Sequence, residues 1–244
     1  NGAGFAALEC AEGDICSKVL EMSLFREGGN SITVSGEKTA GGPETAVFNF
    51  SVLSSGNIYV DDSPETSPHF SSIQAAINAA TTSDTIIVRD GNYNEELTIG
   101  KSLTIKSENG ASTTLINPGL IGSTAISAAN VTIKGFKFTG RGFGKGMVVT
   151  GSNVTIEDSV IADFLTGIEA TGASFLSLKN NDIGNTGSPT GKTGIKISGF
   201  DGAIITGNRI NNNSKGVEVS DSSNVLIRDN KFSGNSSGAV MNAT

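Results

Sequence analysis

The chain has 244 residues, of which 36% are hydrophobic and 6% aromatic, with 32 glycines, 5 prolines and no tryptophan. Its formal net charge of −7 argues against a nucleic-acid binder that relies on a basic face, and no apolar stretch is long enough to span a bilayer. A composition rich in glycine, asparagine, serine and threonine favours an all-β protein with many turns.

The glycosylation motifs give weak support for an exported protein. The sequence begins at Asn1 without an initiator methionine or a signal peptide, which predicts a processed, mature form located at the cell surface or outside the cell. In that setting Cys10 and Cys16 can pair with each other or cross-link to a neighbouring chain. N-glycosylation sequons, which chance also produces in a chain this rich in Asn, Ser and Thr, lie at Asn49, Asn130, Asn153, Asn212, Asn235 and Asn242.

Residues 1–56 differ in pattern from the rest of the chain. Strands are predicted over residues 31–34 and 46–53, separated by glycine-rich turns. This region is either a small β module or an arm that packs on the rest of the chain or on a neighbouring subunit. We therefore expect a domain boundary after residue 56 and a second domain over residues 57–244.

The second domain is predicted to open with a short amphipathic helix over about residues 71–80. Ser71 or Ser72 is a suitable N-cap for this helix. Short strands follow it, beginning with residues 85–88 and 97–99. The helix would cover the open end of the first coil, whose backbone groups would otherwise be unpaired.

From residue 131 onward the sequence repeats itself. Five segments align, and each is followed by a second short strand that opens with a glycine. The period is about 22 residues, with one longer step that contains a loop insertion over residues 184–191. The opening glycines are Gly146, Gly167, Gly194, Gly216 and Gly238.

A repeat of this length, built from short strands, is typical of a solenoid in which stacked coils bury apolar faces that a single coil cannot bury. Alternation along each strand sends one set of side chains inward and the other, which includes Glu169, Lys196 and Glu218, to solvent. Three interior columns are predicted, namely Ile133, Ile156, Leu178, Ile205 and Ile227; Phe138, Ile161, Ile183, Ile210 and Phe232; and Met147, Ile168, Ile195, Val217 and Ala239.

A fourth column consists of polar turn residues. Ser159, Asn181, Asn208 and Asn230 occupy equivalent positions in successive repeats. Asparagine tolerates left-handed backbone angles, and stacked asparagine side chains can hydrogen-bond along the solenoid axis. We interpret Asn181, Asn208 and Asn230 as an asparagine ladder with a structural role.

The segment SIQAAINAATTSDTIIVRDGNYNEELTIGKSLTIKS resembles the opening of pectin-lyase-like β-helix proteins, especially NosD-type and archaeal surface-layer or sheath β-helix repeats. The resemblance extends from residue 57 to the C-terminus. It implies an all-β fold: a right-handed parallel β-helix solenoid with a short N-terminal capping helix and an N-terminal β arm or small β module. Because this fold hosts lyases, esterases, adhesins and structural proteins, it does not by itself specify a function.

No catalytic constellation stands out in the sequence. The only glutamine is Gln74, on the predicted helix, and the only histidine is His69, just before it, whereas the esterases and polygalacturonases of this fold need such residues beside paired acids. A polysaccharide lyase needs a base, commonly beside Ca²⁺-binding acids. We predict no catalytic residue, no cofactor and no required metal, with Ca²⁺ as an option. The residues available to a lyase are Lys179, Arg228, Asp158, Asp163, Asp182 and Asp229.

The last repeat ends close to Thr244, and no capping helix is predicted after it. Either residues 235–244 fold over this end, or the uncovered coil pairs with another chain. The second reading predicts an extracellular structural protein of a cell envelope, not an enzyme. It would self-assemble into a sheath, surface layer, tube or filament through its coil edges and N-terminal arm, with Cys10 and Cys16 as cross-links.

Two alternatives remain open. The first is a carbohydrate-binding or polysaccharide-cleaving, lyase-like β-helix, and the second is an adhesin or a secreted fragment of a larger surface protein. The expected partners are further copies of the chain and cell-surface glycans, with no nucleic acid and no membrane span.

Overall fold

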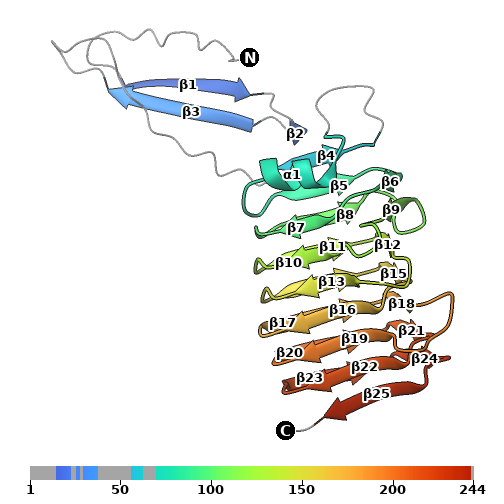
Figure 1. The fold of residues 1–244 in the computed structure, drawn as a ribbon. Helices are drawn as coiled ribbons and strands as arrows, with labels where there is room; N and C mark the ends of the chain where they lie inside the picture. The colour runs from blue at the N-terminus through green and yellow to red at the C-terminus, as the bar shows by residue number, and fades with distance from the viewer. Residues whose placement is uncertain (1–14, 23–25, 28–29, 38–55, 63–69, 243–244) are drawn as a thin grey trace.

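The structure is a computed structural model that describes residues 15–22, 26–27, 30–37, 56–62 and 70–242. Most of the described chain forms a parallel β-helix, a column of stacked coils that begins at a short helix and ends at strand β25 (Figure 1). Each complete coil contributes one strand to each of three parallel sheets.

The N-terminal strands are antiparallel, in contrast to the solenoid. Strand β1 (Ile15–Met22) pairs with β3 (Asn30–Glu37), and the short strand β2 (Arg26–Glu27) pairs with β4 (Asn57–Val60), the first strand of the solenoid. This region therefore contains β strands, as predicted, and β3 contains the predicted strand 31–34. Its role as an arm or as a small module stays a prediction. The strand predicted over 46–53 lies outside the described residues.

Three sheets form the walls of the solenoid. The first sheet contains β4, β5 (Thr85–Val88), β8 (Thr104–Ser107), β11 (Val131–Lys134), β14 (Val154–Glu157), β17 (Ser174–Lys179), β20 (Asp201–Thr206) and β23 (Ser223–Arg228), with β2 at its edge. The second contains β6 (Gly91–Tyr93), β9 (Thr114–Ile116), β12 (Lys137–Thr139), β15 (Val160–Ala162), β18 (Asp182–Gly184), β21 (Arg209–Asn211) and β24 (Lys231–Ser233). The third contains β7 (Leu97–Ile99), β10 (Thr124–Ile126), β13 (Lys145–Val149), β16 (Thr166–Thr171), β19 (Thr193–Ser198), β22 (Lys215–Ser220) and β25 (Ser237–Asn242).

Each coil turns three times. The chain passes from the first sheet to the second at what we name the first corner, from the second to the third at the second corner, and back to the first sheet at the third corner. The predicted insertion over residues 184–191 lies at the second corner, between β18 and β19. The glycine-rich segment 140–144 lies at the same corner two coils earlier in the chain, between β12 and β13.

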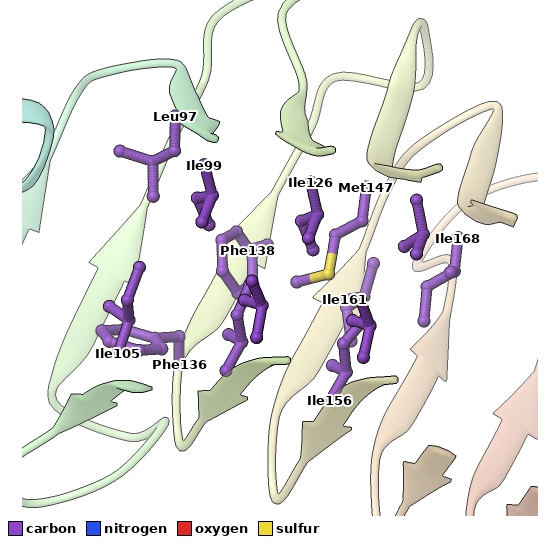
Figure 2. Close-up of a cluster of buried hydrophobic side chains, with 14 of the residues drawn as sticks. Leu97, Ile99, Ile105, Ile126, Phe136, Phe138, Met147, Ile156, Ile161 and Ile168 are labelled. Atoms are coloured by element: carbon purple, nitrogen blue, oxygen red, sulfur yellow. The ribbon is translucent and has the colours of Figure 1, made fainter. Parts of the chain in front are cut away.

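The core is the stack of apolar columns predicted from the repeat. The strand registers align Ile156 with Leu178, Ile161 with Ile183, and Ile168 with Ile195, and they confirm the order of all three predicted columns. In the last coil the column members are less covered, since Ile227 and Phe232 are half-buried and Ala239 is exposed. The side chains from the three sheets meet in the interior (Figure 2). Each fully buried Ile, Leu or Val contributes about 1.5–3 kcal/mol, so that the continuous column is the main source of stability.

Helix α1 (Ile73–Ala79) covers the N-terminal end of this core, as predicted. Ile73, Ala76 and Ile77 are buried, and Ser72 is the N-cap, accepting a hydrogen bond from the Ala75 amide. The next coil fixes both ends of the helix. Glu95 accepts hydrogen bonds from Ser72 Oγ and from two first-turn amides at 2.7–2.9 Å, while Lys101 Nζ donates to three carbonyls of the last turn. A carboxylate at the N-terminus and an ammonium at the C-terminus also match the helix dipole.

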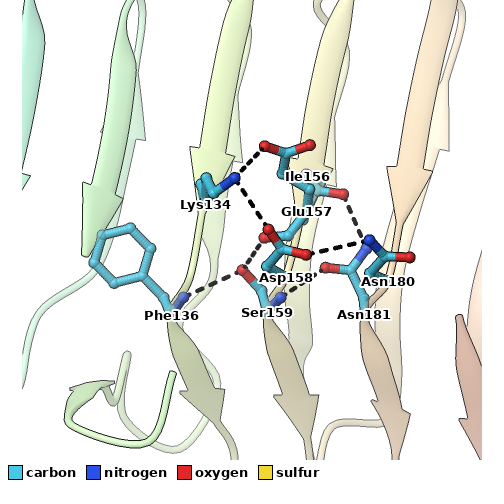
Figure 3. Close-up of polar contacts among 8 residues, drawn as sticks. All are labelled: Lys134, Phe136, Ile156, Glu157, Asp158, Ser159, Asn180 and Asn181. Carbon is cyan, nitrogen blue, oxygen red and sulfur yellow. Dashed lines mark hydrogen bonds and ion pairs between the residues drawn. The ribbon is translucent and has the colours of Figure 1, made fainter. Parts of the chain in front are cut away.

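The first corner carries the predicted asparagine ladder (Figure 3). From β11 onward, a residue with positive φ, such as Asp158 or Asn180, follows each strand of the first sheet and turns the next side chain inward. The amides of Ser159, Asn181 and Asn208 each donate to the Oδ1 atom of the asparagine one coil further on, at 2.9–3.0 Å. The ladder thus binds coil to coil inside the protein, and its structural interpretation is confirmed.

The repeated glycines at the second corner let neighbouring strands approach closely. A Cβ atom on Gly194 would lie 2.6 Å from the carbonyl oxygen of Gly216, and Gly146, Gly167 and Gly216 are similarly close to the next coil. Only glycine fits this spacing, which explains the glycine near the start of β13, β16, β19 and β22.

Candidate functional site

The residues predicted to be available to a lyase do not form one site. Lys179 and Arg228 both lie at the end of first-sheet strands, but Thr206 of β20 stands between them in the register. Asp158 and Asp229 lie at the first corner, where Asp158 accepts from Lys134 Nζ at 3.1 Å and Asp229 lies 3.8 Å from Arg228. These groups are spread along one edge of the solenoid and do not converge.

The remaining acids of that set are held by structural partners on the second sheet and at the second corner. Asp163 accepts from the backbone amide and the hydroxyl of Thr186, and so fixes the start of the loop insertion. Asp182 pairs with Arg209 at 3.0 Å and accepts from Asn211 Nδ2 at 2.7 Å. These contacts tie one coil to the next.

A denser arrangement of charge lies on the outer face of the third sheet. The register aligns Glu169, Lys196 and Glu218 on three consecutive strands. Lys145 Nζ lies 2.9 Å from Glu169 Oε2, and Lys215 pairs with Glu218. We name these five residues the charged face. The two carboxylates are only 16–17% exposed, which means that neighbouring side chains shield them from water.

Loops of the second corner form a rim along this face. Successive loops are joined by backbone hydrogen bonds, since Gly144 accepts from Leu165 and Leu165 accepts from Thr193. These loops carry exposed apolar side chains, with Ile121 exposed by 77%, Phe143 by 59% and Leu165 by 46%. We name the loops 117–123, 140–144, 163–165 and 185–192 the loop rim.

The geometry of the charged face permits acid–base chemistry. Glu169 and Glu218 are two strands apart, which corresponds to roughly 9.5 Å between their backbones. Inverting glycoside hydrolases hold an acid and a base carboxyl roughly 6.5–9.5 Å apart, leaving room for a water molecule. Lys196 stands between the two glutamates in the register and can bind an anionic group of a ligand.

Sequence reasoning placed Glu169, Lys196 and Glu218 on the solvent face but did not identify them as a site. The available signal was the alternation of charge at one repeat position, namely Glu, Lys and Glu at successive positions of the aligned glycine-led strands. Lys145 and Lys215 could not be added from the sequence, because each precedes its glycine and its direction depends on the corner.

Several other predictions are not tested by the structure. His69, Cys10 and Asn49 lie outside the described residues, and so does the side chain of Cys16 on β1. Gln74 lies on α1, where its amide bridges Asn78 and β7. The use of the sequons stays a prediction; their asparagines at 130, 153, 212 and 242 are exposed, whereas the Asn235 amide hydrogen-bonds within the second corner.

Within the described part of the chain, no three His, Cys, Asp or Glu side chains are placed to hold one metal ion. No helix of that part is long and apolar enough to cross a bilayer. The expectation that no cofactor is required, with Ca²⁺ as an option, stays a prediction.

Comparison with known families gives one match. The model described as "Right handed beta helix region" matches residues 109–244, which is more than half of the chain. A comparison with curated proteins gave no match.

Solved structures with the same fold are similar to this one. They include a pectate lyase, Pel9A (TM-score 0.54, 18% identity, 77% of this chain and 62% of that chain), and the pectin methylesterase PemA from Erwinia chrysanthemi (0.51, 16%, 70% and 66%). An alginate lyase from Paenibacillus sp. str. FPU-7 matches with a TM-score of 0.51 at 17% identity, over 67% of this chain and 74% of that chain. The chain spans slightly less than two thirds of the length of the first two.

These matches confirm the predicted pectin-lyase-like β-helix and correct one prediction. The chain was expected not to be an enzyme, and that expectation is contradicted because these structural neighbours are enzymes. Identities of 16–18% establish the fold alone, so the activity is treated as a proposal. The NosD-type and archaeal likeness, the extracellular location and the expected lack of nucleic-acid partners stay predictions.

Proposed function

This chain belongs to the right-handed β-helix family, and from that premise we propose that it binds and cleaves a polysaccharide along the outer face of its third sheet. The observation that carries the proposal is the charged face, with two shielded carboxylates, a lysine between them in the register and a rim of exposed apolar side chains beside it. Structural neighbours that act as pectate and alginate lyases support the same reading.

Each part of the face has a role in the proposed reaction. Glu169 and Glu218 act as the acid–base pair at the glycosidic bond, in keeping with their spacing. Lys145, Lys196 and Lys215 outnumber them and attract an acidic polysaccharide, although the chain as a whole carries a charge of −7. Apolar side chains of the loop rim, such as Phe143, pack against the apolar faces of sugar rings.

The test is an activity assay on pectate, alginate and an α-1,3-glucan. Release of reducing ends reports any cleavage, and ultraviolet absorbance of an unsaturated uronate separates elimination from hydrolysis. We expect Glu169→Gln and Glu218→Gln each to lower kcat by about 10²–10⁴, the range for removal of a general acid or base. Lys196→Ala should mainly raise KM for an acidic substrate.

The matched control is Glu157→Gln. Glu157 is also ion-paired to a lysine, Lys134, but it lies on the first sheet, away from the charged face. Its replacement should leave turnover unchanged. If none of the three polysaccharides is cleaved, or if Glu157→Gln lowers kcat as much as Glu169→Gln, the proposal is wrong.

The predicted envelope building block is a second proposal with one observation in its favour. Among the described residues, β23, β24 and β25 each pair with a neighbour on one side only. Val225, Ile227 and Phe232 of these strands are half-buried, whereas the equivalent residues of earlier coils are buried. A further coil, from this chain or another copy, would complete the pairing. Sedimentation velocity at increasing concentration, with and without reductant, tests self-assembly and the proposed cysteine cross-links.

A further inference from the structure

The third corner contains an aromatic residue in an unfavourable backbone conformation. The register places Asn153, Phe175, Gly202 and Asn224 side by side at the start of successive first-sheet strands. All four have positive φ, between 53° and 76°. Asparagine and glycine adopt this conformation readily, whereas a bulky residue there is strained. Phe175 is therefore the exception in a column whose other members are residue types that favour positive φ.

The strain is not explained by burial of the ring. Phe175 is 66% exposed, and its ring extends over Gly202, where a Cβ atom would lie 3.2 Å from Phe175 Cδ1. Ile204 and Leu226 follow on the next two strands and are 43% and 47% exposed. In the register Ile204 and Leu226 align with Ser177, two residues beyond Phe175. Phe175, Ile204 and Leu226 thus form an exposed apolar strip over three successive strands of the first sheet.

Hydrogen-bonding groups border this strip. Asp201 directly precedes Gly202, and its Oδ1 accepts from Ser223 Oγ at 2.6 Å and from Asn224 Nδ2 at 2.7 Å. Among the described residues no donor reaches Asp201 Oδ2. The carboxylate is therefore fixed in position by two bonds on one oxygen, while the other oxygen can accept from a ligand.

From this arrangement we propose that Phe175, Asp201, Ile204 and Asn224 form a binding site for a neutral glycan, separate from the charged face. The apolar face of a pyranose ring stacks on Phe175, its hydroxyl groups donate to Asp201 Oδ2, and Ile204 extends the contact along the sugar chain. The hydrogen bonds from Ser223 and Asn224 lower the pKa of Asp201, which keeps the carboxylate charged. A charged Asp201 repels uronates and leaves neutral sugars as the matching class.

A second copy of the chain fits the strip less well. A stable protein interface buries about 20–30 residues on each side, whereas here three apolar side chains lie among polar neighbours. An aromatic ring with an adjacent fixed carboxylate matches the size and the hydroxyl pattern of a single sugar.

The test separates binding from stability through Phe175→Asn. This variant restores the residue type found at 153 and 224, so its thermal midpoint should equal or exceed that of the parent protein. Its affinity for a neutral glycan should be at least about tenfold weaker, because the stacking ring is lost. Asp201→Ala should also weaken binding, and Asp90→Ala, which removes another exposed acid, should not.

Binding is measured by calorimetry and affinity electrophoresis with dextran, a soluble β-glucan and xylo-oligosaccharides, with polygalacturonate as the acidic comparison. The Glu169→Gln/Glu218→Gln background prevents turnover, so that the result does not depend on the proposed activity. Binding of a neutral glycan that Phe175→Asn abolishes supports the site. The proposal is overturned if no neutral glycan binds at millimolar concentration, if Phe175→Asn binds like the parent, or if sedimentation shows a dimer that Phe175→Asn dissociates.

Discussion

The first and second corners both connect one sheet to the next, but they differ in how much their loops vary in length. At the first corner, coils from Gly135 onward use a residue with positive φ followed by an inward side chain, which from Ser159 onward is polar and hydrogen-bonds to the next coil. At the second corner the loops range from three residues at 163–165 to eight at 185–192. The buried hydrogen bonds of the first corner restrict the length and sequence of its turns. The loops of the second corner are hydrogen-bonded to their neighbours mainly at their ends. Chemistry can therefore change at the second corner without loss of the fold.

The largest expected effect comes from cutting the ladder at the first corner. Asn208 is 1% exposed, accepts from two groups of Asn181 and donates to the Leu178 carbonyl at 2.9 Å. Asn208→Ala leaves several buried polar groups without partners, each costing about 1–3 kcal/mol. We expect the free energy of unfolding to fall by about 3 kcal/mol, measured by urea denaturation.

Lys179→Ala is the control for this change. Lys179 is the last residue of β17 in the first sheet, two residues before Asn181, and its side chain is exposed. Its replacement should alter stability by less than about 0.5 kcal/mol. Equal losses in the two variants would mean that the ladder does not hold the coils together.

A shorter ladder at the second corner sharpens the comparison. Asn185 Nδ2 donates to Asn213 Oδ1 at 2.8 Å, and Asn213 in turn bonds to Asn235. This ladder ends at Asn185, whose buried Oδ1 has no partner among the described residues. Asn213→Ala should therefore cost less than Asn208→Ala, about 2 kcal/mol in urea denaturation. An effect larger than that of Asn208→Ala would contradict the ranking of the two corners.

The two corners also differ in how well the sequence predicts them. The ladder and the apolar columns were predicted residue by residue, because the period of about 22 residues repeats the same environment. The charged face was not predicted as a site, because it depends on which strands lie side by side and on how each corner directs the side chains of Lys145 and Lys215. Phe175 was missed for a related reason: its strain is visible only when the register places it in a column of Asn and Gly. Loops and single exceptions to a repeat carry little periodic signal.

The first corner of the earliest coil lacks the ladder and uses Tyr93 instead. The buried Tyr93 hydroxyl donates to the Arg89 carbonyl at 3.1 Å. Tyr93→Phe should cost about 1 kcal/mol at pH 7, the net value of one hydrogen bond. The first corner of this coil thus contributes less to the free energy of unfolding than the corners that contain the asparagine ladder.

The same tyrosine gives this corner a pH dependence. Burial, followed by the charges of Asp62 and Asp61, raises the pKa of Tyr93 well above its ordinary value of 10.0. The unfolded chain ionises this group near pH 10 and the folded chain does not, so the protein loses stability as the pH rises past 10. The stability gap between parent and Tyr93→Phe should shrink between pH 7 and pH 11 in urea titrations. A gap independent of pH would refute this.

The smallest effect on stability should come from shortening the longest loop of the second corner. Deletion of residues 187–191 reduces the loop 185–192 to three residues, the length found at 163–165 and 212–214. The bonds at the loop ends, from Thr193 to Leu165 and from Ser214 to Lys192, do not involve the deleted residues. Because closure entropy changes slowly with loop length, we expect a change within about 0.5 kcal/mol in urea denaturation. Under the proposed function, the same deletion should raise KM for the polysaccharide several-fold, because it removes part of the loop rim. A large loss of stability would mean that the second corner is as constrained as the first, and the division between a corner that builds the fold and a corner that carries the chemistry would not hold.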